Sequence, residues 1–299
     1  MAVIYDIRLL IAYHYPGFVA DARHILRVEP REDRGQSVLA SRLRFEPTPS
    51  ELQRETDFFG NRTAHGLIAR PHDALRVELE TRVRVERPAP RLEDTPTLRQ
   101  VREWSASSLE SEGDSPIHFG GAGRLVSPSA KVAAYVAETL EAAPAIGLGL
   151  LMLSRRIRSD FRFQAGVSSV ATRVEETFAT RRGVCQDFSH MMIAGLRGCG
   201  VPAAYASGFL RTEPPPGRPR LAGADAMHAW VEAWAGPDAG WIGLDPTNGC
   251  LAGEDHVLVA LGRDYADVAP IDGVLITAGP QKHHHAVDMV PVEPEVTAS

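Results

Sequence analysis

The chain has 299 residues, of which 44% are hydrophobic and 23% are charged, and its formal net charge is −6. This composition is that of a folded globular protein and excludes a mostly disordered chain. The acidic balance gives no global electrostatic case for binding nucleic acid or an anionic membrane surface. At about 150 residues per domain, the length predicts two domains.

The first 90 residues are predicted to form a β-rich domain. Segments 37–45 and 74–85 alternate, and in the second segment one parity is almost wholly apolar: Leu75, Val77, Leu79, Thr81, Val83 and Val85. Half-buried strands have this period of two. A turn is expected at 57–61. Together these features predict an antiparallel, β-sandwich-like domain over residues 1–90.

The N-terminal stretch and the cysteines predict a cytoplasmic protein. Residues 3–13 have the composition of a strand, and Asp6 and Arg8 interrupt them too early for the core of a signal peptide. No apolar stretch reaches the ~18 residues of a membrane helix. Three cysteines are too few for a disulfide framework, and none forms a CxxC pair: Cys185, Cys199 and Cys250. Such a count suits a reducing compartment.

The second half is predicted to be an α+β domain over residues 129–299. Residues 91–128 are rich in proline, serine and glycine and are expected to be a connecting segment. Apolar periodicity then predicts helices at about 130–140, 147–161 and 183–200. Strand patterns follow at about 201–210, 228–234, 241–245, 256–261 and 273–277. Helices followed by a run of strands favour α+β over alternating β/α.

Cys185 is the first candidate for chemistry. It lies at the predicted start of the third helix, directly after Gly183-Val184. The helix dipole and the unpaired amides at this end stabilise a thiolate relative to a thiol. The same amides can donate hydrogen bonds to an oxyanion during acyl transfer. A buried, inert thiol is the alternative interpretation of this segment by itself.

A histidine and an aspartate are expected to meet on the following hairpin. If Trp234 pairs with Trp241, strand parity places His228 and Asp245 on one face, diagonal to each other and within ~7–8 Å between backbones. The carboxylate would orient the imidazole, and the imidazole would take the cysteine proton. A register slip of one residue would separate the two side chains.

In these segments the sequence resembles the transglutaminase-like superfamily, which has a papain-like core. The resemblance rests on residues 182–188, 228–232 and 240–248, and on the order cysteine, histidine, aspartate. Residues 57–61 and 262–270 are similar to the flanking regions of bacterial members. By this resemblance Cys185 is the nucleophile, His228 the general base and acid, and Asp245 the orienting carboxylate. The fold expected is a papain-like core preceded by a β-sandwich-like domain.

The resemblance implies an amide acyl-transfer enzyme that acts through a cysteine thioester. It would hydrolyse or transamidate a peptide, protein or small amide, without a cofactor and without a metal. Gln186 follows the cysteine where the calcium-activated animal enzymes have tryptophan, so neither calcium dependence nor crosslinking is implied. The alternative is a non-catalytic binding module that retains the fold. The acyl donor, the acceptor and the oligomeric state leave no mark in the sequence.

Several further residues have two interpretations. Gln186 and Trp230 are pocket or oxyanion candidates, although packing explains Trp230 equally well. His283-His284-His285 is favoured as a polar strand over a metal site, because no third ligand is evident. The proline-rich segment 212–220 is hypothesised to border the cleft.

Overall fold

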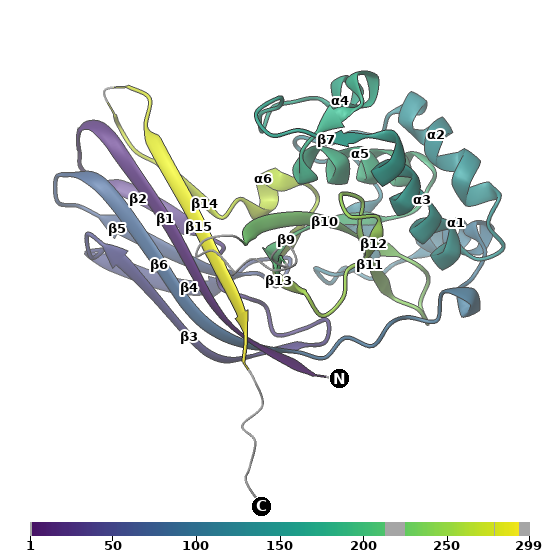
Figure 1. Cartoon of the computed structure of the whole chain (residues 1–299), viewed down its shortest axis with the longest axis horizontal. Helices are drawn as coiled ribbons and strands as arrows, with labels where there is room; N and C mark the ends of the chain where they lie inside the picture. Colours follow the sequence, from purple (N-terminus) through teal and green to yellow (C-terminus); the bar gives the residue numbers. More distant parts are fainter. Residues whose placement is uncertain (1, 213–224, 278, 293–299) are drawn as a thin grey trace, which may run out of the picture.

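The computed structural model describes residues 2–212, 225–277 and 279–292, so most of the proline-rich segment 212–220 lies outside the described residues. The chain forms two halves (Figure 1): a pair of β-sheets, and a mixed core in which helices pack against a third sheet. This is the predicted fold class. Among the described helices, none is both long and apolar enough to cross a membrane.

Two four-stranded antiparallel sheets form the first half. One has the order β15-β1-β6-β3, and the other has the order β14-β2-β5-β4. The strands of the first sheet are β1 (Val3–Val19), β3 (Gln36–Glu46), β6 (His72–Val85) and β15 (Lys282–Pro291). Those of the second are β2 (Ala22–Leu26), β4 (Glu51–Thr56), β5 (Arg62–Ile68) and β14 (Ile271–Val274).

The alternation in β6 orients this sandwich. All six residues of the predicted parity are buried, and they pack with the inward side chains of β1, β2 and β5. Burying a row of valines and leucines on one face is what fixes the strand register, since a slip of one residue would turn the row to water. The strand predictions at 37–45 and 74–85 and the turn at 57–61 are confirmed.

The last two strands depart from the predicted domain division. Residues 129–299 were expected to form one unit, but β14 pairs with β2 and β15 pairs with β1. The C-terminal segment therefore returns to the sandwich and completes both of its sheets (Figure 1). The physical reason is edge pairing: β1 and β2 would otherwise expose unpaired backbone groups along one side.

The core contains a five-stranded sheet of order β12-β11-β10-β9-β13. Its strands are β9 (Ala203–Leu210), β10 (Ala226–Trp234), β11 (Trp241–Asp245), β12 (Cys250–Leu251) and β13 (His256–Gly262). A separate short parallel pair is formed by β7 (Arg162–Phe163) and β8 (Arg182–Gly183). The predicted strands of this region are confirmed, within a few residues at their ends.

Helices pack against this sheet and against one another. They are α1 (Leu98–Ser107), α2 (Ala130–Glu141), α3 (Ile146–Asp160), α4 (Val174–Thr180), α5 (Cys185–Gly198) and α6 (Tyr265–Val268). The central helix α5 is buried from Asp187 to Arg197. Gly195 permits its close packing on α2, because a Cβ there would lie 2.3 Å from Val136 Cγ2. The apolar periodicity predicted α2, α3 and α5.

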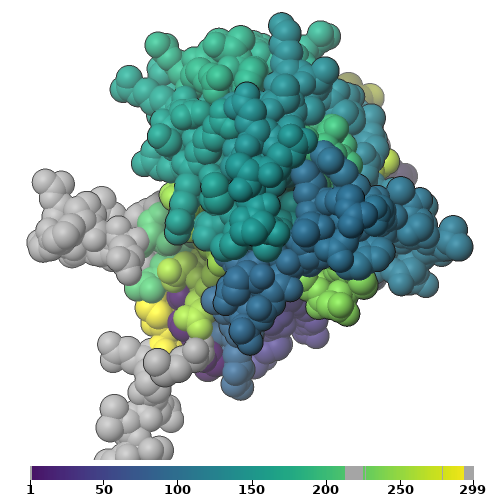
Figure 2. Space-filling model, turned by 90° about the vertical axis from the view of Figure 1, so that its right-hand side faces the viewer, coloured from purple at the N-terminus to yellow at the C-terminus, as the bar shows by residue number. Residues whose placement is uncertain are grey.

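The connecting segment 91–128 is more ordered than expected. It contains α1, whose start is held by a reciprocal pair: Thr97 Oγ1 accepts from the Gln100 backbone, and Gln100 Oε1 accepts from the Thr97 backbone. The many prolines and serines around this helix concealed it. Two 3₁₀ turns flank it (Leu92–Asp94 and Pro116–Phe119). In Figure 2 the segment, in blue, crosses the molecule between the teal helices and the purple strands.

Candidate active site

The start of α5 is fixed by a buried carboxylate. Asp187, 3% exposed, accepts a hydrogen bond from the Val184 backbone N–H at 2.7 Å and another from the Ser168 hydroxyl. Gly183 leaves room for this carboxylate, because a Cβ there would lie 2.8 Å from the Asp187 side chain. Cys185 is consequently held as the first residue of the helix, half-buried and beside amides with no partner within the helix.

His228 and Asp245 meet across the hairpin. Trp234 pairs with Trp241, which confirms the register on which the sequence argument depended. His228 Nε2 lies 2.8 Å from Asp245 Oδ2. The imidazole is 8% exposed and the carboxylate is fully buried. A charge-assisted hydrogen bond shielded from water in this way fixes both the ring orientation and the tautomer.

Both carboxylate oxygens of Asp245 accept hydrogen bonds. Its Oδ1 accepts from the backbone N–H groups of Thr247 and Asn248, at 2.9 and 3.0 Å. Its Oδ2 accepts from Asn248 Nδ2 at 2.6 Å and pairs with His256 Nε2 at 3.2 Å as well as with His228. Burial alone would raise the pKa of the carboxyl group. The hydrogen bonds and charges of the two histidines outweigh burial and hold the pKa of Asp245 well below its usual range.

The same balance sets the charge of His228. Burial favours the uncharged imidazole, but hydrogen bonds to Asp245 and to the Cys185 side chain, together with their charges, raise the pKa of His228 to about 10. Near neutral pH the ring is therefore an imidazolium. With Nε2 committed to Asp245, Nδ1 is the ring nitrogen left to exchange a proton with the sulfur of Cys185. The structure thus brings all three predicted catalytic residues together.

His228, Asp245 and His256 also resemble a metal-binding set, since their ligand atoms lie within 4.8 Å of one another. Their hydrogen bonds favour a different use. The Gly253 backbone N–H donates to His256 Nδ1 at 3.2 Å, so the proton of this ring is on Nε2 and points to Asp245. A metal ion would bind Nε2 only without its proton. The ring proton would then be on Nδ1, where it would face the Gly253 N–H, which is also a donor. The geometry fits a hydrogen-bonded network.

The two pocket candidates lie in different surroundings. Gln186 is half-buried, and its Nε2 lies 3.5 Å from the carbonyl oxygen of Val170. Trp230 is fully buried, and its indole N–H donates to Glu232 at 3.0 Å. The Trp230 ring stacks beside His228, with ring centroids 6.5 Å apart. In this position Trp230 packs the back of the imidazole, and its N–H is already occupied.

Three other residues in or near α5 lie in packed or hydrogen-bonded positions away from His228. His190 is buried, and its Nε2 accepts from the Tyr265 backbone at 3.2 Å. Tyr205 pairs with Val231 across β9 and β10, so it lies on the sheet face opposite His228. Cys199, also buried, ends α5 with its sulfur 3.4 Å from a backbone carbonyl oxygen of α2. All three cysteines are free thiols.

Sequence reasoning missed His256. It begins β13, is 4% exposed and contacts Asp245, yet no spacing links it to the triad motifs. Its neighbours along the chain are those of any buried strand. Asn248 had a clearer signal, because an Asp-x-x-Asn turn after a strand is suited to self-capping.

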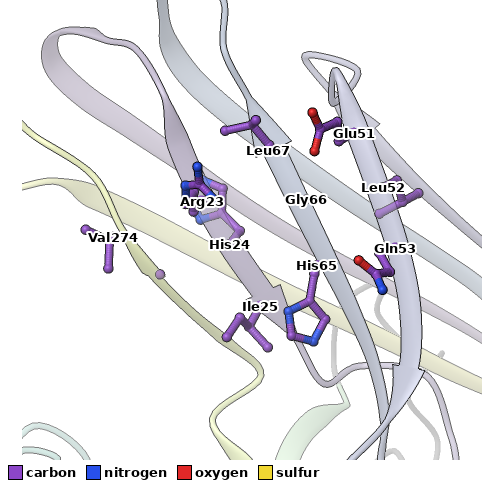
Figure 3. A pocket seen from close by; sticks show the side chains of 11 residues that line it. Arg23, His24, Ile25, Glu51, Leu52, Gln53, His65, Gly66, Leu67 and Val274 are labelled. Atoms are coloured by element: carbon purple, nitrogen blue, oxygen red, sulfur yellow. The ribbon is translucent and has the colours of Figure 1, made fainter.

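A groove of about 590 Å³ lies away from this site, on the sheet β14-β2-β5-β4 (Figure 3). It is lined by β2, β4, β5 and β14, with Arg23, Glu51, Gln53 and His65 among its polar side chains. No proposed catalytic residue contributes to it. The groove is therefore separate from the predicted catalytic residues.

Each half of the chain matches a known protein family. Residues 5–84 match the bacterial transglutaminase-like N-terminal region, and residues 134–246 match the transglutaminase-like superfamily. The second match ends one residue after Asp245 and includes Cys185 and His228.

Relatives extend the similarity over nearly the whole chain. An uncharacterized protein of Mycobacterium tuberculosis is 34% identical over 286 residues, which cover 94% of this chain and 90% of the relative. An uncharacterized protein of Mycobacterium leprae is 29% identical over 251 residues, covering 83% and 84% of the two chains. The crystal structure of a candidate cysteine protease from Cytophaga hutchinsonii covers 99% of this chain and 93% of its own, with a TM-score of 0.75 and 21% identity.

Proposed function

Because the chain belongs to the transglutaminase-like superfamily, we propose that it is an amide acyl-transfer enzyme that forms a thioester on Cys185. The observation that carries the proposal is the continuous contact from Cys185 to His228 and from His228 to Asp245. The substrate class is a peptide, protein or small amide, and the acyl group passes to water or to an amine.

In the first half-reaction Cys185 is the nucleophile and His228 is the acid. The Cys185 sulfur attacks the carbonyl carbon, and the oxyanion that develops accepts hydrogen bonds from amides at the start of α5. The carbon–nitrogen bond then breaks, and the imidazolium of His228 gives its Nδ1 proton to the leaving nitrogen. A thioester and an amine result. Asp245 keeps the imidazole in place while its charge changes.

The second half-reaction reverses these roles. The imidazole of His228, now uncharged, takes a proton from the incoming water or amine as that nucleophile attacks the thioester carbon. The carbon–sulfur bond breaks and the sulfur leaves as a thiolate beside the renewed imidazolium. Water gives hydrolysis, whereas an amine gives transamidation.

Selective alkylation tests the proposal. At about pH 6, where ordinary thiols react slowly, iodoacetamide should modify Cys185 much faster than the other cysteines. Peptide-level mass spectrometry reports each site separately. Cys250 is the matched control: it is also half-buried, but burial and the nearby Asp245 raise the pKa of its thiol to about 11. Cys250→Ser should leave the labelling of Cys185 unchanged.

Capture of the acyl-enzyme from a library of peptide amides then identifies the substrate. Wild-type protein should retain an acyl group on Cys185, and Cys185→Ala should retain none. Equal labelling of Cys185 and Cys250 at this pH would contradict the proposal. Binding of an amide without thioester formation would instead support a non-catalytic binding module.

We propose that this reaction takes place in the cytoplasm. Three free thiols, one of them half-buried at the proposed active site, support a reducing compartment. Fractionation of cells that produce the protein, with detection by an antibody, tests this location directly.

A further inference from the structure

His256 touches the proposed centre without belonging to the predicted triad. Its Nε2–H points to Asp245 Oδ2 at 3.2 Å, on the same oxygen that pairs with His228. Its ring lies 6.2 Å from that of His228 and 5.3 Å from that of Trp230, measured between centroids. The titratable groups around Asp245 are therefore His228 from β10, His256 from β13 and Cys250 from β12.

A tight turn holds the His256 ring in one orientation. The Gly253 N–H donates to Nδ1 at 3.2 Å, and the His256 N–H donates back to the Gly253 carbonyl oxygen at 3.2 Å. A ring that accepts at Nδ1 must carry its proton on Nε2 when it contacts a carboxylate. The turn thus selects the tautomer that can donate to Asp245.

The N-terminal half holds this turn. Arg87, which follows β6, donates through Nη1 to the carbonyl oxygens of both Gly253 and His256, at 3.0 and 3.1 Å. Gln36 donates to the Leu258 carbonyl oxygen at 2.7 Å and accepts from the Leu258 N–H at 2.8 Å. The side chain of Asn61 forms the same reciprocal pair with Leu261.

These contacts satisfy one edge of β13, the last strand of the core sheet. Arg87 and Gln36 also hold each other, with Nη2 3.4 Å from Oε1. The strand that carries His256 is therefore fixed by the sandwich, and its position relative to Asp245 depends on both halves of the chain.

We propose that His256 is a positioning residue for the Cys185–His228–Asp245 centre, and that Arg87 of the N-terminal half holds it in place. The inference rests on the proposed function. His256 would fix the rotation of the Asp245 carboxylate and help to keep it ionised, so that His228 remains aimed at the sulfur.

The test compares the pH dependence of Cys185 alkylation among full-length variants. In His256→Leu the donor to Asp245 is lost while the volume of the side chain stays filled. We expect labelling to slow roughly tenfold, the effect of losing one hydrogen bond to a charged group, and its acidic limb to move to higher pH. His256→Gln can still donate to Asp245 and should retain the wild-type profile.

His24→Leu is the matched control, because His24 and His256 are both 4% exposed and His24 lies in the sandwich. It should label as the wild type does. Arg87→Gln should move the acidic limb in the same direction as His256→Leu, by less. Thermal unfolding of each variant identifies any that fails to fold. Nitrogen NMR of the wild type, which needs no variant, should find the His256 proton on Nε2.

A folded His256→Leu with the wild-type profile would overturn the inference, as would a His256→Gln that is as slow as His256→Leu. A proton on Nδ1 would also overturn it. If wild-type Cys185 itself labels no faster than Cys250, the proposed function fails. If the wild type labels rapidly and only the His256 comparison fails, the proposed function stands.

Discussion

Two regions of the molecule bury histidines to a similar extent and shift their pKa values in opposite directions. In the sandwich, His24 is 4% exposed, its Nε2 has no hydrogen-bond partner in the described part of the chain, and burial together with the nearby His72 lowers its pKa to about 4. In the core, His228 is 8% exposed and its pKa is raised to about 10. Burial by itself removes charge from an imidazole; a buried carboxylate and a cysteine reverse that outcome.

The difference is the reason that we propose acyl transfer for the core and not for the sandwich. An uncharged imidazole buried in the sandwich, such as that of His24, is not poised to donate a proton near neutral pH. An imidazolium beside a sulfur can exchange a proton. Asp245 is therefore the group that makes the core differ from the sandwich. The following experiments change Asp245 itself or histidines of the two regions.

The largest effect is expected from Asp245→Asn. This substitution removes the carboxylate charge that orients the His228 imidazole and stabilises its protonated form. The alkylation rate of Cys185 near neutral pH should therefore fall by about 10²–10⁴-fold. The measurement is the second-order rate constant with iodoacetamide. His24→Gln, which alters the other buried histidine, should leave that rate constant within about twofold. Similar losses in both variants would show that the two regions do not differ in this way.

Stability on the alkaline side should depend on His228. Its folded-state pKa of about 10 exceeds the ordinary value near 6.5, so its contribution is complete below about pH 6.5 and is lost as pH rises toward about 10. The free energy of unfolding, measured with denaturant, should decline across this window. His228→Gln should flatten the decline; an unchanged slope would contradict the assignment.

Stability at acidic pH should depend on His24. Here the free energy of unfolding should fall as pH falls, whereas the contribution of His228 falls as pH rises. Its folded-state pKa of about 4 lies below the ordinary value, so the unfolded chain binds the extra proton between about pH 6.5 and 4. Stability should fall in this window as pH falls, by on the order of 1–2 kcal/mol at about pH 5. His24→Leu should reduce that loss. A variant that loses stability as steeply as the wild type would place the effect elsewhere.

The smallest effect is expected from the exposed histidines of β15. His283, His284 and His285 lie on the edge strand paired with β1. Replacing all three with alanine should change the free energy of unfolding by less than about 0.5 kcal/mol per site and leave Cys185 labelling unchanged. Isothermal titration with Zn²⁺ checks the alternative, since tight binding that disappears in the variant would indicate a metal site there.

Local signals predicted most of the fold. Alternation placed β6 with the buried parity that the structure has, and pairing of Trp234 with Trp241 was sufficient to bring His228 to Asp245. Both inferences involve residues close in sequence, where parity and turn length determine the geometry. The resemblance of three short segments then assigned their roles.

The missed features depend on contacts distant in sequence. His256 reaches Asp245 from β13, which pairs with β9 and is also held by Gln36, Asn61 and Arg87 from the other half of the chain. The return of β14 and β15 to the sandwich likewise depends on which edges are left unpaired. Such choices are made by the assembled tertiary structure, and composition or periodicity within one segment does not record them.

An NMR titration of the His228 imidazole tests the central claim most directly. The wild-type ring should stay protonated through neutral pH and titrate near pH 10, and in Asp245→Asn it should lose its proton at much lower pH. Titration of the wild-type ring at its ordinary value near pH 6.5, unaffected by Asp245→Asn, would contradict the account.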